Sequence, residues 1–249
     1  MTDIYKRINK HYEAAVAHYG EDAVFGVMHY GSWNYKTNLP DSDVDTKCIL
    51  IPDLYHLAIK PYEVKHLHID DEVCECMSIM HMVENWKKQN INFVEIMFTP
   101  YFKVNPKYSE FWDAEGILSE DWAERIARYD MNKAVLSMSY QALNTLHQGP
   151  EDLKKIMNAV RISNSLTRLI DEKRPPYTKV IRMDSAVAGI RTGETPIAEC
   201  VVPDLELFFN HMIEEAKNGA WLPDPEEKSK VDKFLEEYVL KLIEYRIGH

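Results

Sequence analysis

The sequence of 249 residues has no uninterrupted apolar run of about 18 residues, the length that a membrane-spanning helix requires. Met1 is followed by the polar stretch 2–13, where a secretory signal would have an apolar segment. Hydrophobic residues nevertheless make up 45% of the chain, enough to bury a sizeable core. We therefore expect a soluble, globular, cytoplasmic protein.

Cysteine is scarce, with four residues scattered along the chain at positions 48, 74, 76 and 200. Cys74 and Cys76 form a C-x-C pair, and no second Cys or His pair follows at zinc-finger spacing. This spacing disfavours a zinc site, and in an intracellular protein it favours reduced thiols with a structural role.

Basic residues are outnumbered, since 29 Lys and Arg stand against 40 Asp and Glu and the formal net charge is -11. A surface this acidic repels a phosphate backbone, so we do not expect long duplex nucleic acid as a partner. The lack of a membrane-spanning apolar run argues against a membrane as a partner. A nucleotide bound through a divalent cation stays compatible with this charge, because the cation supplies positive charge locally.

Apolar periodicity predicts an α+β fold class with a mixed sheet and flanking helices in the first half. The spacing indicates helices over 2–18 and 78–88, whereas 93–98 fits either a helix or a strand. Strands are expected over 23–30, 43–51, 64–69 (at an edge of the sheet) and 72–79.

From residue 119 onward the pattern is helical, which predicts a C-terminal helical domain. Long helices are expected over 119–147, 151–172, 203–218 and 225–246. We expect the chain to divide within 105–118, giving a catalytic domain over 1–110 and a helical domain over 111–249 that completes the groove.

The chemically informative residues are Gly31 and Ser32, followed after ten residues by Asp43 and Asp45. On a strand, residues two apart point to the same side, so the two carboxylates are expected side by side. Such a pair suits Mg2+ or Mn2+, because like charges this close need a cation between them. A glycine-containing turn can grip phosphate oxygens through its N–H groups and the serine hydroxyl. Two ions at the site would serve phosphoryl or nucleotidyl transfer.

A third carboxylate is expected on the strand over 72–79. There Glu75 lies between two cysteines that we expect to be buried. Asp70 and Asp71 are rivals for this role, although they also read as a solvated turn. Lys47 continues the alternation of Asp43 and Asp45, so it can face the same groove or form an ion pair with Glu75.

These residues resemble the DNA polymerase beta superfamily of nucleotidyltransferases, whose signature is h-G-S, a spacer and D-x-D on the following strand. The runs 31–35 and 42–47 are similar to a bacterial and phage branch of predicted nucleotidyltransferases, as is the later segment 87–98. The resemblance implies an NTP donor, two metal ions contacted by Asp43 and Asp45, and Glu75 completing the site. Position 75 departs from the superfamily pattern, because it holds glutamate, with a longer side chain, where the pattern has aspartate.

The resemblance also implies cations that hold the triphosphate, and the helix over 151–172 offers Lys154, Lys155 and Arg161. Lys155 is the first choice, while a solvated helix face with i,i+4 pairs explains the same pattern. After the Gly-Ser turn, Asn34 is a candidate for sugar or base contact, although turn chemistry alone explains an asparagine there. The turn at 175–177 is a candidate for a loop over the groove.

The sequence thus predicts a metal-dependent nucleotidyltransferase that moves NMP from an NTP to an acceptor and releases pyrophosphate. The acceptor is a hydroxyl or phosphate on a small molecule, a protein side chain or an RNA end such as a tRNA terminus, and the acidic surface favours the small molecule. The alternative is a catalytically silent NTP-binding regulatory protein of the same fold.

Overall fold

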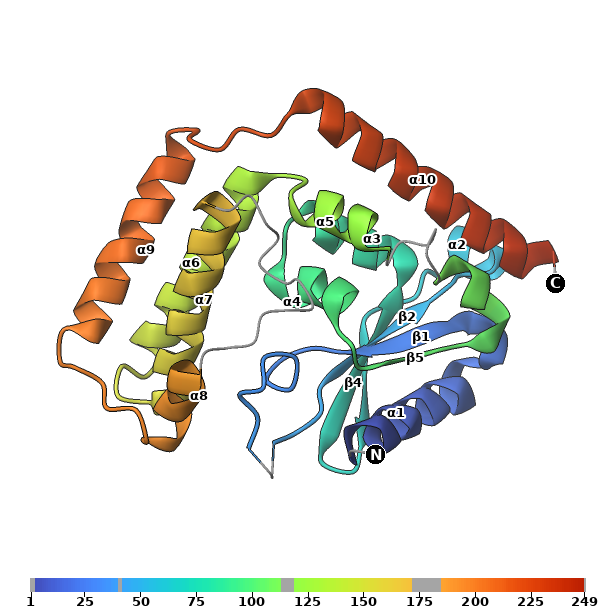
Figure 1. Ribbon diagram of the computed structural model, residues 1–249. Helices are drawn as coiled ribbons and strands as arrows, with labels where there is room; N and C mark the ends of the chain where they lie inside the picture. Colours follow the sequence, from blue (N-terminus) through green and yellow to red (C-terminus); the bar gives the residue numbers. More distant parts are fainter. Residues whose placement is uncertain (1–2, 40–41, 113–118, 172–184, 249) are drawn as a thin grey trace.

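The computed structural model describes residues 3–39, 42–112, 119–171 and 185–248. These residues form one mixed sheet surrounded by helices, which confirms the predicted α+β class (Figure 1). None of the described helices is long and apolar enough to cross a membrane.

The sheet has five strands in the order β3-β4-β2-β1-β5. Strands β2 and β4 pair in parallel, and the other neighbours pair antiparallel. The expected edge strand is β3, while β5 at the opposite edge was not predicted. The strands are β1 (Val24–His29), β2 (Thr46–Leu50), β3 (Lys65–Ile69), β4 (Glu72–Ser78) and β5 (Phe102–Val104).

One face of the sheet is covered by α1 (Asp3–Tyr19), as the spacing of Ile4, Ile8 and Ala15 predicts. The other face packs against α3 (Ile79–Lys87), which begins after the capping side chain of Ser78. The ambiguous run 93–98 is helical. The remaining short helices of this half are η1 (Glu21–Ala23), α2 (Leu54–Ala58), α4 (Ile91–Val94), η2 (Glu95–Phe98) and η3 (Pro106–Phe111).

The second half is helical, as predicted, but the expected helix over 119–147 is two helices. The chain breaks at residues 128–130, where the Asp130 carboxylate accepts the Lys133 N–H and starts the second helix. Helix α8 was not predicted. The helices are α5 (Glu120–Ala127), α6 (Met131–His147), α7 (Leu153–Asp171), α8 (Ser185–Thr192), α9 (Val201–Lys217) and α10 (Pro225–Gly248).

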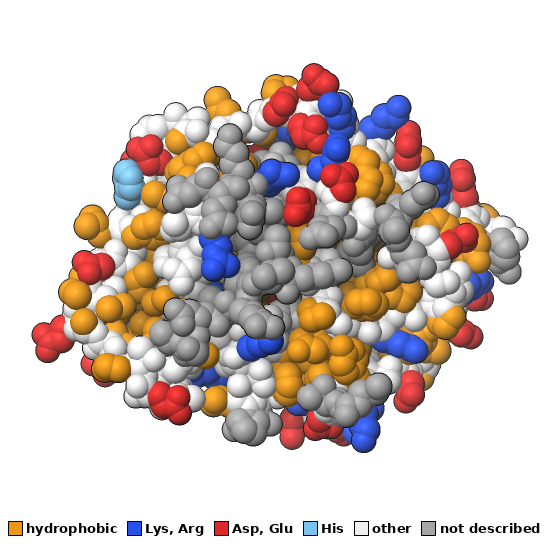
Figure 2. All heavy atoms as spheres, viewed as in Figure 1, with side chains coloured by type: hydrophobic (Ala, Val, Ile, Leu, Met, Phe, Trp, Pro, Cys, Tyr) orange, Lys and Arg blue, Asp and Glu red, His pale blue; other side chains and the backbone are white. Residues whose placement is uncertain are grey.

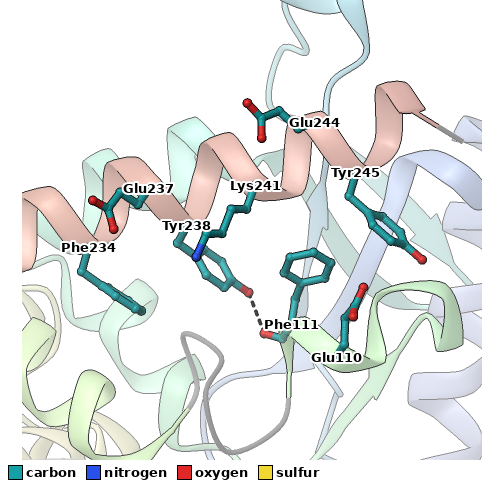
Figure 3. A pocket seen from close by; sticks show the side chains of 8 residues that line it. All are labelled: Glu110, Phe111, Phe234, Glu237, Tyr238, Lys241, Glu244 and Tyr245. Atoms are coloured by element: carbon teal, nitrogen blue, oxygen red, sulfur yellow. Dashed lines mark hydrogen bonds between the residues drawn. The ribbon is translucent and has the colours of Figure 1, made fainter.

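The last helix leaves the bundle and returns across α5 and α3 to the sheet half (Figure 1). Its Asp232 forms an ion pair with Lys87 at 2.6 Å, and its Arg246 donates to the Ile51 carbonyl. A groove of about 460 Å³ lies between α10 and η3, where the Tyr238 hydroxyl donates to the Phe111 carbonyl at 2.8 Å (Figure 3).

Candidate functional site

A cleft of about 210 Å³ lies where the ends of β1 and β2 meet helices α4, α6, α7 and α8. Both halves of the chain therefore contribute to its walls. The cleft is lined by His29, Tyr30, Gly31, Ser32, Tyr35, Asp43, Asp45, Asn92, Glu95, Gln141, Lys154, Met157, Asn158, Arg161 and Arg191.

The Gly31-Ser32 turn directly follows β1. Gly31 has φ +99°, a conformation that disfavours a side chain, although a Cβ built there meets no atom within 4 Å. The turn is closed by the Tyr35 N–H, which donates to the Ser32 carbonyl at 3.2 Å. The Gly31 N–H donates to Glu95 Oε1 at 2.7 Å, so this amide is already engaged and is not open to a phosphate.

Glu95 was not predicted as a site residue. Its side chain is buried, accepts both the Gly31 N–H and the Tyr35 hydroxyl, and so ties η2 to the turn. The available signal in the sequence was a lone carboxylate within the apolar run 93–98, since a buried charge needs partners.

Asp43 and Asp45 both line the cleft, but the expected strand over 43–51 begins only at Thr46. The reason is that the Val44 N–H donates to Glu72 Oε1 at 2.9 Å instead of to a neighbouring strand. The two carboxylates reach the cleft from a loop, yet both line it while Val44 between them is buried in the core under α1, so they lie on one side as the alternation predicts.

Side chains of α1 and β4 hold the loop that carries Asp43 and Asp45. Arg7 donates to the Ser42 carbonyl at 3.0 Å and forms an ion pair with Glu72. The buried His11 ring bridges Thr46 Oγ1 at 2.7 Å and Glu72 Oε2 at 3.1 Å. Glu72 is therefore the centre of a network, which we call the loop clamp, formed by Arg7, His11, Glu72 and Thr46.

Electrostatics within the loop agree with two interacting carboxylates. Burial raises the pKa of Asp45, and the negative charge of Asp43 raises it further. The positive charge of Lys154 opposes both effects. Asp43 itself is exposed and Asp45 is half-buried, so the pair faces the cleft with one carboxylate at its mouth and one deeper inside.

Glu75 and Lys47 lie opposite each other on β4 and β2 and form an ion pair. The Lys47 side chain is 2% exposed, and its Nζ lies 4.4 Å from the Tyr30 ring centroid and 4.1 Å from that of Phe93. Neither Glu75 nor Lys47 lines the cleft. Of the two arrangements open for Lys47, the structure shows the ion pair.

The rivals for the third carboxylate also lie outside the cleft. Asp70 and Asp71 are exposed in the turn between β3 and β4, and Asp70 pairs with Lys10 at 3.2 Å. No three Asp, Glu, His or Cys side chains of the described residues come together as ready-made metal ligands.

The helical half brings three cations to the cleft, namely Lys154, Arg161 and Arg191. The Arg161 guanidinium lies 4.0 Å from the Tyr35 ring centroid. Arg191 donates to the Thr37 carbonyl at 2.5 Å and to Ser42 Oγ at 3.3 Å, so it also holds the loop that carries the aspartates. Arg191 had no signal in the sequence, because α8 itself was not predicted.

Two predicted nucleotide-binding residues point elsewhere. The Lys155 ammonium donates to the Gln148 carbonyl at 3.1 Å, and Lys155 is absent from the cleft lining. The Asn34 amide donates to the His29 carbonyl at 3.3 Å and accepts from Thr99 Oγ1 at 2.7 Å. Asn34 therefore stabilises the Gly31-Ser32 turn. The candidate loop at 175–177 lies outside the described residues.

In Figure 2 some basic side chains lie near the middle of the face, and others lie toward the rim together with most of the acidic side chains.

No protein-family model matches the chain, and no curated protein matches it.

Proposed function

We propose that this chain is a metal-dependent nucleotidyltransferase that transfers NMP from an NTP to an acceptor hydroxyl or phosphate and releases pyrophosphate. One observation carries the proposal. A single cleft holds the carboxylates of Asp43 and Asp45 on one wall and the cations Lys154 and Arg161 on the other. A metal-bound triphosphate needs both kinds of group at once, carboxylates for the metal and cations for the phosphates.

The donor set of the cleft fits Mg2+ or Mn2+, because two neighbouring carboxylates supply hard oxygen ligands and leave room for phosphate oxygens. Asp43 and Asp45 would hold the ions, which when bound neutralise phosphate charge and activate the attacking oxygen. We propose two ions per site, as the resemblance to the polymerase beta superfamily implies. The third carboxylate predicted for that arrangement, Glu75, would first have to leave its ion pair with Lys47.

The remaining groups bind and orient the donor. Lys154 and Arg161 attract the negative charge of the triphosphate, which builds up further as pyrophosphate leaves. Ser32 lines the cleft, and its hydroxyl would donate to a phosphate oxygen, while Glu95 keeps the turn in place through the Gly31 N–H. Catalysis by this site is therefore alignment and charge neutralisation.

The test is to incubate the purified protein with Mg2+ or Mn2+ and each of the four α-labelled NTPs. Label is sought on the protein itself, on total tRNA and on a pool of small metabolites, and pyrophosphate is followed in parallel. Asp43→Asn should release none, whereas Asp204→Asn, an exposed carboxylate on α9, should behave as wild type. Pyrophosphate release that survives Asp43→Asn would refute the assignment of the site.

The second candidate is a catalytically silent regulatory protein that binds NTP and metal. The Lys47–Glu75 ion pair favours it, because the third carboxylate is neutralised by a buried lysine. This candidate predicts metal-dependent NTP binding without pyrophosphate release from any of the four NTPs, so the same assay separates it from the enzyme.

A further inference from the structure

One face of α7 lines the cleft, and along this face charged side chains stand at the two ends with uncharged side chains between them. Lys154, Met157, Asn158 and Arg161 all line the cleft, at the spacing i, i+3, i+4 and i+7 that shares one helix face. The two cations are thus about 10 Å apart along the axis. Between them lie an amide and a thioether, neither of which carries charge.

Two further amides come to the same cleft from other helices, Gln141 from α6 and Asn92 from α4. All three amide side chains are half-buried, and none has a hydrogen-bond partner among the described residues. Other amides of this chain are engaged, as Asn105 shows by donating to two backbone carbonyls. Unpaired amides that converge on a cleft suit a ligand with its own donors and acceptors, because each amide offers both.

We infer that Asn92, Gln141 and Asn158 form a nucleobase-selecting wall, so that the cleft distinguishes NTPs by their base; the inference rests on the proposed function. Charged groups suit the triphosphate, whereas amides suit the neutral edge of a base, where donors and acceptors lie side by side. Met157 offers a polarisable apolar surface on which an aromatic base can pack.

The alternative use of the same wall is recognition of the acceptor, and it predicts a different result. If the amides bind the acceptor, the affinity for the donor is the same for all bases. If they read the base, the four NTPs bind with different affinities, and the difference depends on these side chains.

The experiment measures dissociation constants for the four NTPs and for inorganic tripolyphosphate, by calorimetry in the presence of Mg2+. We expect the four NTPs to span at least about tenfold in affinity, the scale of one well-made polar recognition contact. Asn158→Leu, which is nearly isosteric, should collapse this span while leaving tripolyphosphate binding unchanged. Gln141→Leu should do the same from a different helix, which guards against a folding defect in one variant.

Two matched variants complete the design. Asn164→Leu changes an exposed asparagine of the same helix and should leave the span intact. Lys154→Gln should weaken all four NTPs and tripolyphosphate alike, because it acts on the phosphates.

Equal affinities for the four NTPs in the wild type would overturn the base-selecting wall and leave the proposed nucleotidyltransferase standing. The same holds if Asn158→Leu and Gln141→Leu weaken every ligand equally. No binding of any NTP would overturn the proposed function and the base-selecting wall together.

Discussion

Removing the centre of the loop clamp should destabilise the protein and loosen the aspartate loop. Glu72→Ala deletes the acceptor of the Val44 N–H and the partner of Arg7 and His11. His11 is fully buried, whereas the Arg7 side chain is 22% exposed and can regain water in part. We therefore expect a loss of about 3 kcal/mol in the free energy of unfolding, most of it from the Val44 N–H and the His11 Nε2, which lose their partner while the His11 Nδ1 keeps Thr46.

Guanidinium denaturation should show this loss as a lower midpoint at an unchanged slope. For a chain of this size, about 3 kcal/mol corresponds to a melting temperature lower by roughly 6–12 °C. Glu72→Gln keeps an oxygen acceptor for the Val44 N–H and should lose about half as much. Glu63→Ala, at an exposed glutamate with no ion pair to another described residue, is the control.

A second readout ties the loss to the loop. Hydrogen exchange of the Val44 amide should be faster in Glu72→Ala, and its Mn2+ affinity should fall because Asp43 and Asp45 are no longer held together. If Glu72→Ala unfolds at the wild-type midpoint, the loop clamp does not stabilise the protein. If the Val44 amide keeps its protection from exchange, the loop clamp does not hold the aspartate loop.

Three further predictions concern single residues of the cleft. Asp43→Asn should abolish turnover and leave the melting temperature unchanged or slightly raised, because it relieves repulsion of Asp45; a variant that unfolds instead contradicts this. Gly31→Ala should lower the free energy of unfolding by about 1–2 kcal/mol in chemical denaturation. The cause is backbone strain at φ +99°, because a Cβ at this position meets no neighbouring atom. An unchanged free energy of unfolding would contradict this strain argument.

Burial lowers the pKa of His29 from 6.5 to about 4, so at pH 5 the unfolded chain binds a proton that the folded chain does not. The contribution of His29 to the free energy of unfolding should therefore fall by about 2 kcal/mol from pH 7.5 to pH 5, measured by chemical denaturation in EDTA. His29→Gln should remove that share of the pH dependence, and an unaltered pH dependence would contradict it.

Local patterns were sufficient for much of the fold. The spacing of Ile4, Ile8 and Ala15 predicts α1, because burial follows the helical period, and the short continuous apolar run 23–30 predicts β1, whose residues are all buried. The break between α5 and α6 was missed although Asp130, an N-cap residue, lies within the periodic run. Strand β5 has three residues, too few to show any period.

The parts of the cleft that sequence reasoning missed depend on residues far apart in the chain. The alternation placed Asp43 and Asp45 on one side correctly, but β2 begins only at Thr46, because the Glu72 side chain, 28 positions from Val44, accepts the Val44 N–H. Arg191 acts across 154 positions on Thr37. Such pairings are set by the packing of helices on the sheet, and no short window of sequence contains them.

The return of α10 has a consequence for how the chain is made. Arg246 meets Ile51 across 195 positions, and Tyr238 meets Phe111 across 127. During synthesis from the N-terminus, the sheet and α3 leave the ribosome well before the helix that covers them. Until α10 arrives, the aromatic side chains beside Phe111 stay in water, and contacts this distant in sequence form slowly. The nascent chain therefore has an interval in which its sheet half is assembled but uncovered, and chaperone binding would matter most in that interval.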